Sequence, residues 1–243
     1  TPPLKLNFKK KALKKDDFFK NCDKIKLVFQ CENNSRMANS ILSEKLIYDL
    51  YGIISPYHFK AFQTKVKIGN DKKNLQALVL EDEKDLMHRT KTAVLKNRTV
   101  GTNAIERKYY VRMCLFQFMI GNTDWSARKG HNTQLFRRLE DNALIIVPYD
   151  FDYSGIINNH YAVPPEQLPI SNVTTRYFMD KSISRAELDP AIEEFLQWKT
   201  EISETVSQAD YLSSGAQKSM SKYIDGFYDL ISNEKKIKRM LKK

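Results

Sequence analysis

Cysteine and glycine are both scarce in this chain of 243 residues, which contains three cysteines and eight glycines. The three cysteines, Cys22, Cys31 and Cys114, do not make the disulfide framework of a small secreted domain. Cys22 and Cys31 flank one predicted strand, and an extended strand, at about 3.3 Å per residue, would hold them roughly 30 Å apart. Because a disulfide needs Cα atoms within about 7 Å of each other, these two should not pair, and we expect free thiols.

Motifs of several common enzyme classes are also missing. The sequence has no GxGxxG, P-loop, HExxH, GxSxG or CxxC pattern, which argues against Rossmann enzymes, Walker ATPases, zinc proteases and α/β-hydrolases. No apolar run reaches the roughly 18 residues of a membrane span, so we expect no transmembrane segment. No signal peptide is visible, and the start at Thr1 instead of Met is consistent with a mature or trimmed product.

Positive charge is abundant. Lysine and arginine number 40 against 29 aspartates and glutamates, which gives a formal net charge of +11. Much of the excess lies at the two ends, 5–26 and 233–243, and such a surface attracts phosphates, nucleic acid or anionic membranes. Charge runs are often only solvated faces, and the chain has no zinc-finger spacing or convincing basic helix-turn-helix. We therefore expect weak, non-specific attraction to nucleic acid that is lost near physiological ionic strength.

The first third of the chain has the pattern of strands around one helix. Alternation and β-branched or aromatic content predict strands at Leu4–Phe8 and Lys24–Cys31, and a hairpin from His58–Ile68 to Leu75–Leu80. Between them, apolar residues at helical spacing predict a helix from Asn39 or Ser40 to about Gly52. This part is therefore expected to be a small sheet with one helix.

The remainder is predicted to be mostly helical, apart from one hairpin. The expected helices cover 104–119, 191–206 and 217–230, and the second of them starts at Asp189 or Pro190. The expected hairpin pairs 133–137 with 144–147. Residues 85–96 are expected to be helical or irregular, and residues 158–169 irregular. Strands followed by helices indicate an α+β fold. We expect a small lobe over residues 1–83 and a helical lobe over residues 84–243.

Four polar residues stand at the ends of these elements. Asp124 follows the long buried helix across a Gly-Asn turn, Asn132 precedes the hairpin, and Asp150 and Asp152 follow it. Carboxylate and amide oxygens suit Mg²⁺ or Mn²⁺, so Asn132 and Asp150 are expected to hold the metal, with Asp152 as a further metal or supporting contact. Asp124 would accept the proton of an acceptor hydroxyl. The alternative is that all four are ordinary turn and cap residues.

At these residues the sequence resembles a known group of enzymes. The segments GNTDW, His131-Asn132 and PYDFD resemble the catalytic and metal segments of atypical protein-kinase-like families, the HipA-like kinases and the spore-coat CotH-like kinases. The resemblance implies a two-lobed protein-kinase-like fold, with a small sheet-plus-helix N-lobe and a helical C-lobe. It also implies a phosphotransferase that uses ATP and Mg²⁺ or Mn²⁺, with a protein or small-molecule hydroxyl as acceptor.

The resemblance extends to the small lobe through the order of its elements. Kinases use a strand lysine on the nucleotide phosphates and pair it with a helix glutamate. In this chain the expected lysine is Lys5 or Lys26, and the expected glutamate is Glu44. The alternatives are a solvent-facing lysine and an acid that only complements the helix dipole.

A hinge between the lobes is also expected from the order of elements. In kinases the backbone at this junction binds the nucleotide base, and the corresponding residues here are Leu80, Glu81 and Asp82. The alternative is a surface acidic turn.

Two departures from the kinase pattern are visible. Asn132 lies eight positions after Asp124, a longer spacing than the five positions of the kinase H-R-D-x-x-x-x-N pattern, with Arg128-Lys129-Gly130 inside it. The first 51 residues contain no glycine, so the glycine-rich phosphate loop lies upstream of Thr1 or is absent. A kinase-shaped binding or scaffold protein without turnover is therefore the main alternative.

Relatives of the CotH type are secreted or coat-associated, which favours an exported address.

Overall fold

The computed structural model describes residues 4–7, 24–30, 32–67, 69, 74–96 and 100–242. The strands are β1 Leu4–Asn7, β2 Lys24–Phe29, β3 Ala61–Val66, β4 Leu75–Leu80, β5 Thr92–Val94, β6 Thr133–Arg138 and β7 Leu144–Pro148. The helices are α2 Ser35–Ile54, α3 Glu83–Thr90, α4 Arg107–Ile120, α5 Arg185–Gln197, α6 Lys199–Ser207, α7 Ser214–Ile231 and α8 Glu234–Leu241, with a short 3-10 turn at Thr102–Ala104. Cys22 and Cys31 lie outside the described residues.

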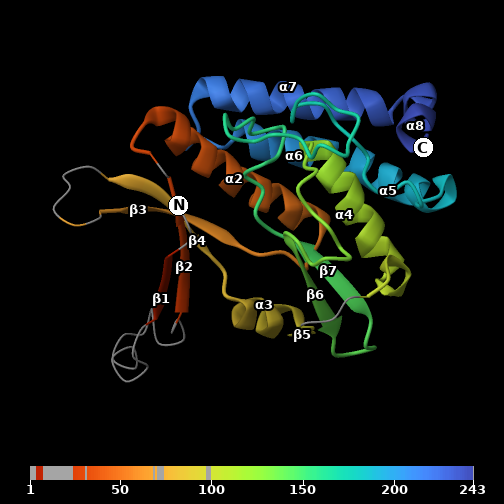
Figure 1. The fold of residues 1–243 in the computed structure, drawn as a ribbon, viewed down its shortest axis with the longest axis horizontal. Coiled ribbons are helices and arrows are strands. Elements are labelled where there is room, and N and C mark those ends of the chain that lie inside the picture. The colour runs from red at the N-terminus through yellow and green to blue at the C-terminus, as the bar shows by residue number, and fades with distance from the viewer. Residues whose placement is uncertain are drawn as a thin grey trace.

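A four-stranded antiparallel sheet, ordered β1-β2-β4-β3, forms one side of the molecule (Figure 1). Helix α2 packs on β3 and β4 with one face and on α4 and α6 with another. Its apolar residues consequently occur all round the helix, and Leu46, Ile47 and Leu50 have no exposed surface. The predicted strands and the hairpin are confirmed, and α2 joins the sheet to the helical part.

The start of α2 differs from the prediction. The helix begins at Ser35, ahead of the expected Asn39 or Ser40, because the Asn34 side chain accepts a hydrogen bond from the Met37 amide and caps the first turn. The apolar periodicity starts only later in the helix, so this cap was the missed signal. Glu44 therefore lies in the middle of α2, away from the positive end of the helix dipole.

A second, three-stranded sheet has the order β5-β6-β7. Its hairpin β6–β7 was predicted and is confirmed, with Thr133 opposite Pro148. Strand β5 was not predicted, because three residues after α3 are too short to show an alternating pattern. Helix α3 occupies part of the segment left as helical or irregular, and Asp82 caps it by accepting from the Lys84 amide.

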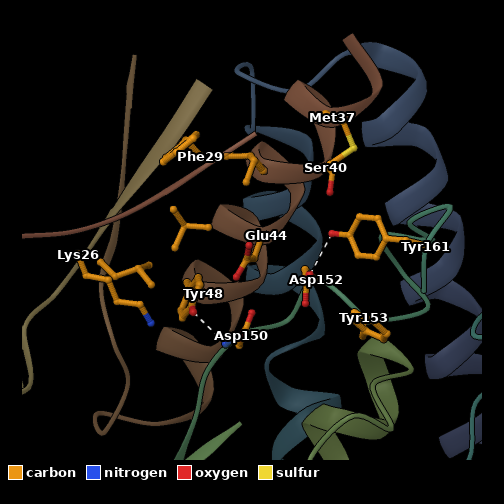
Figure 2. A pocket seen from close by; sticks show the side chains of 13 residues that line it. Lys26, Phe29, Met37, Ser40, Glu44, Tyr48, Asp150, Asp152, Tyr153 and Tyr161 are labelled. Carbon is orange, nitrogen blue, oxygen red and sulfur yellow. Dashed lines mark hydrogen bonds between the residues drawn. The ribbon is translucent and has the colours of Figure 1, made fainter. Parts of the chain in front are cut away.

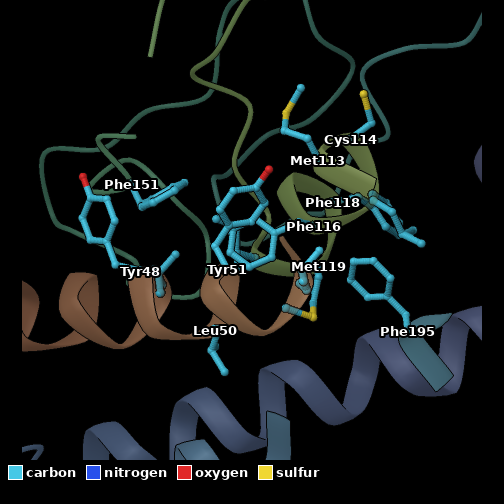
Figure 3. Packing of buried hydrophobic residues seen from close by; sticks show 14 of the residues in the cluster. Tyr48, Leu50, Tyr51, Met113, Cys114, Phe116, Phe118, Met119, Phe151 and Phe195 are labelled. Atoms are coloured by element: carbon cyan, nitrogen blue, oxygen red, sulfur yellow. The ribbon is translucent and has the colours of Figure 1, made fainter. Parts of the chain in front are cut away.

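Helix α4 is the centre of the helical part. All its residues from Tyr110 to Ile120 are buried, and aromatic rings surround it: Phe116 packs against Tyr51 of α2, and Phe118 packs against Phe178 (Figure 3). On its other side Arg112 forms two hydrogen bonds with Glu194 of α5, each 2.5 Å long. Packing from both sides fixes the end of α4, where the candidate site begins.

The C-terminal helices differ from the prediction in two ways. The segment expected as one helix is two, and α5 starts after Ser184, whose hydroxyl forms a capping box with Glu187. Pro190 therefore lies inside α5 and does not begin it. Helix α8 was treated only as a basic end, although Ile237 and Met240 are buried. In the part of the chain that the structure describes, no helix has the length and apolar character of a membrane span.

Candidate active site

The loop after α4 positions Asp124. Gly121 ends the helix with a φ of 66°, and a Cβ atom there would collide with the Tyr223 hydroxyl, so the position requires glycine. Asn122 is buried, and its side-chain oxygen accepts a hydrogen bond of 2.9 Å from the Asp124 amide. The backbone of Asp124 is thereby held before its side chain makes any contact.

Asn132 contacts Asp124 directly. Its amide nitrogen donates to the backbone oxygen of Asp124 at 2.8 Å and to the carboxylate oxygen Oδ2 at 3.0 Å. Because the nitrogen faces Asp124, the side-chain oxygen of Asn132 is the atom oriented for a cation. His131, which is exposed, lies 2.8 Å from the other carboxylate oxygen, Oδ1, through its Nε2 atom. Both oxygens of Asp124 therefore have partners.

The extra residues between Asp124 and Asn132 form a closed turn. Ser126 and His131 exchange two backbone hydrogen bonds of 2.9 and 3.1 Å, and the Ser126 hydroxyl accepts from the Lys129 amide at 3.2 Å. Gly130 has a φ of 62° within this turn. The longer spacing thus leaves Asn132 beside Asp124.

The hairpin brings Asp150 to the same place. The Tyr149 amide donates to the Asn132 backbone oxygen at 3.1 Å, so Asn132 and Asp150 lie at the same end of β6 and β7. Asp150 has a φ of 63°, and its amide donates to the Tyr48 hydroxyl of α2 at 3.0 Å. Burial raises the pKa of its carboxyl above the usual range, and nearby Lys26 counteracts this rise.

Asp152 is held by a small network. The Tyr161 hydroxyl donates to its carboxylate oxygen Oδ2 at 2.9 Å (Figure 2). The buried Asn159 amide donates to the backbone oxygen of Asp152 at 2.8 Å. The Asn159 amide also donates to the Tyr161 hydroxyl. Burial, followed by the charge of Asp150, raises the pKa of Asp152 to about 6.

Glu44 points from α2 toward these carboxylates. It is buried, and its side chain accepts from the Phe151 amide at 3.4 Å. Burial and the charges of Asp150 and Asp152 raise the pKa of Glu44 to about 8, while Lys26 counteracts the rise. Figure 2 shows Lys26 and Glu44 facing the same space, so the geometry favours Lys26 over Lys5 as the lysine associated with Glu44.

Two cavities adjoin at this site. One, of about 360 Å³, is lined by Lys26, Glu44, Asp150 and Asp152 among others (Figure 2). The second, of about 720 Å³, is lined by residues that include Lys5, Lys26, Leu80, Glu81 and Asp82. Lys26, Tyr48 and Leu80 line both cavities. Apart from Asn132, which lines neither cavity, the residues expected to bind nucleotide and metal line these two adjoining cavities, which together form the cleft.

The acidic residues of the expected hinge have structural partners. Arg89 of α3 donates to both carboxylate oxygens of Glu81, at 2.9 and 2.8 Å, and to the backbone oxygens of Pro56 and His58. Asp82 caps α3. Their side chains are therefore occupied, and any contact of this segment with a base would come from its backbone.

The donors at the cleft suit a hard cation. Among the described residues, no group of three or more His, Cys, Asp or Glu side chains lies close enough to hold a metal ion. The available set is the Asn132 amide oxygen with the carboxylates of Asp150 and Asp152, all oxygen donors. Magnesium bound through one or two carboxylates takes its remaining ligands from water and phosphate, so this set fits magnesium.

Several contacts of the site were not found from the sequence. His131, Asn159 and Tyr161 act through hydrogen bonds across loops, and only the neighbouring position of His131 could have pointed to it. Arg176 donates to the backbone oxygens of Met119 and Tyr223. Its guanidinium also stacks 3.7 Å from the Tyr223 ring centre, so Arg176 stabilises the loop.

Comparisons with known proteins agree with this architecture. A family model described as CotH kinase protein matches residues 55–242. The structure is similar to that of the proinflammatory kinase CtkA of Helicobacter pylori, with a TM-score of 0.51 and 11% identity over 91% of this chain and 90% of that one. At this identity the likeness concerns the fold alone, and it confirms the predicted α+β, two-lobed kinase-like fold. No curated protein matches the sequence.

Proposed function

The chain belongs to the CotH kinase family, and from this premise we propose that it is a phosphotransferase that moves the terminal phosphoryl group of ATP to a hydroxyl group. Mg²⁺ or Mn²⁺ is the proposed metal, and the acceptor is a protein or a small molecule. We take the division between the lobes to lie near residue 83, with the nucleotide in the cleft beside it. An exported address stays a prediction.

The contact between Asp124 and Asn132 carries the proposal. It joins the loop after α4 to the hairpin that bears Asp150, and so gathers Asp124, Asn132 and the backbone next to Asp150 at one end of β6 and β7. Turn or cap residues without a common function need not converge in this way. The convergence therefore favours the metal and nucleotide site over the alternative in which these residues only cap elements.

In the proposed reaction Asp124 accepts the proton of the acceptor hydroxyl while that oxygen bonds to the terminal phosphorus and the bond from phosphorus to the bridging oxygen breaks. Asn132 and Asn122 orient Asp124 from its side chain and its backbone. Lys26 is placed to bind phosphate oxygens. Asn132, Asp150 and Asp152 would hold the metal, which when bound neutralises phosphate charge.

A binding protein without turnover is the second candidate. One observation favours it: both carboxylate oxygens of Asp124 are already hydrogen-bonded, to His131 and to Asn132. An acceptor hydroxyl would have to share Asp124 with His131, whose side chain is 55% exposed, or displace it.

Transfer of labelled phosphate from ATP, to the protein itself or to added acceptors, distinguishes the two candidates. We expect Asp124→Asn to lower transfer by about 10²-fold or more, the usual contribution of a general base, while nucleotide binding persists. Asp225→Asn, an exposed position on α7, is the control and should transfer like the wild type. If the wild type binds Mg²⁺ and ATP but transfers no more than Asp124→Asn, the protein is a binding protein.

A further inference from the structure

One face of the strands β1 and β2 carries a row of lysines. The strands are antiparallel, with Lys5 opposite Lys26 and Asn7 opposite Lys24. Directly opposed residues share a face, and so do residues two apart in one strand, so all four side chains lie on the same face. The opposite face carries Leu4, Leu6, Ile25 and Leu27.

This lysine face looks into the cleft. Lys5, Asn7, Lys24 and Lys26 all line the cavity of about 720 Å³, and Lys96, which follows β5, lines it from the other side. Figure 1 shows β1 and β2 on one side of this region and α3 with β5 on the other. A lysine face that served only to contact solvent would not be expected to lie across a cavity from a further lysine.

The acids of this cavity offset part of the positive charge. They are Glu81, Asp82 and Glu83. Glu81 is paired with Arg89 through two hydrogen bonds, and Asp82 accepts from the Lys84 amide as the cap of α3. Four lysines face three acids, one of which is already paired with Arg89, so the cavity has a net positive charge and attracts an anion.

Lys26 connects this face to the candidate metal site. It lines both cavities, lies 5.6 Å from the centre of the Tyr149 ring, and acts electrostatically on Asp150. A chain of phosphates that began beside Asp150 would therefore pass Lys26 and continue along Lys24 and Lys5.

We propose that the face formed by Lys5, Lys24 and Lys26, with Lys96 opposite, is a polyphosphate site that binds the triphosphate chain of the nucleotide and makes the cleft weakly selective for the base. The proposal rests on the proposed function, since it names how the same cleft recognises its nucleotide. The lysine side chains do the work that backbone amides of a glycine-rich loop do in other kinases, in a chain whose first 51 residues contain no glycine. Ammonium groups recognise phosphates as point charges and do not read a base.

The test measures binding by calorimetry, without relying on turnover. The ligands are ATP, GTP, CTP, adenosine and inorganic tripolyphosphate, each with and without Mg²⁺ and across a salt series. The variants are Lys24→Gln and Lys96→Gln, with Lys65→Gln as control, because Lys65 is an exposed lysine on β3 of the same sheet.

We expect the dissociation constants of the three nucleoside triphosphates to lie within about threefold of one another, a difference in binding free energy that is close to the thermal energy. Tripolyphosphate should compete, adenosine should bind far more weakly, and affinity should fall steeply with salt. Lys24→Gln and Lys96→Gln should each weaken triphosphate binding by about fivefold, the factor for the roughly 1 kcal/mol of one water-screened charge at about 4 Å. Lys65→Gln should match the wild type.

Two results would overturn parts of this scheme, and they are distinguishable. If ATP binds with strong preference over CTP and neither lysine variant changes its affinity, the polyphosphate site is wrong while the proposed function stands. If tripolyphosphate binds through Lys24 and Lys96 but no nucleotide binds more tightly than it, with no transfer from ATP, the phosphotransferase is wrong and the lysine site stands. If neither tripolyphosphate nor any nucleotide binds, both the polyphosphate site and the phosphotransferase are wrong.

Discussion

The two sides of the cleft are built in different ways. On the helical side Asp124, Asn132 and Asp150 are joined by hydrogen bonds between residues close in sequence, through one turn and one hairpin. On the sheet side the contacts are long-range: Glu44 meets the Phe151 amide, and Tyr48 meets the Asp150 amide. The match to the CotH family model covers residues 55–242, which includes the first side and excludes β1, β2 and all of α2. The helical side is thus defined locally, whereas the sheet side depends on how α2 packs.

The contacts of Arg89 with Glu81, Pro56 and His58 give the largest expected effect on the free energy of unfolding. Arg89→Met removes the partner of Glu81, whose side chain is only 9% exposed, and two hydrogen bonds to the backbone oxygens of Pro56 and His58. We expect a loss of about 2 to 3 kcal/mol in the free energy of unfolding, since a half-buried ion pair is broken on one side only. Urea denaturation followed by circular dichroism measures it.

Arg185→Met is the matched control for Arg89→Met. Arg185 forms exposed ion pairs with Asp189 and Glu234, so its loss should cost no more than about 1 kcal/mol. If both variants lose the same stability, Arg89 has no special role at the junction, and the sheet side owes its position to other contacts.

A milder change tests the link between the two sides. Tyr48→Phe removes the hydroxyl that accepts from the Asp150 amide, and should weaken binding of Mg²⁺ and ATP by about fivefold, the value of roughly 1 kcal/mol for one hydrogen bond. Tyr51→Phe, on the same helix, is the control. Its hydroxyl is buried but makes no hydrogen bond of ordinary geometry with the described residues, so binding should not change. Equal effects would mean that α2 responds only to packing.

The difference between the sides also explains what the sequence could predict. The segments around Asp124, Asn132 and Asp150 were recognisable because their residues and their turn signals lie together in the chain. Glu44 was assigned only from the order of elements, and its burial against Asp150 and Asp152 depends on packing of residues more than a hundred positions apart. The pairing of Glu81 with Arg89 and the capping of α3 by Asp82 likewise required the fold.

The smallest expected effect concerns pH. Burial lowers the pKa of His58, near the hinge, below its usual range; the charge of Arg89 adds to this and that of Glu81 opposes it. The unfolded chain therefore binds a proton at this residue more readily, and stability falls as the pH drops below about 6.5. His58→Gln should reduce the loss of melting temperature between about pH 7 and pH 5. An unchanged loss would mean that His58 is not responsible for it.

The central claim is that the two sides form one metal and nucleotide site, and thermal denaturation with ligand tests it most directly. Melting temperatures are compared without ligand, with ATP, and with ATP plus Mg²⁺, for the wild type and for Asp150→Asn. Selective binding to the folded protein at about 100 times Kd adds roughly 2.7 kcal/mol of stability, so Mg²⁺ with ATP should raise the melting temperature of the wild type clearly. Asp150→Asn should lose the metal-dependent part of this rise. No rise at millimolar nucleotide and metal, or an equal rise in the variant, would contradict the site.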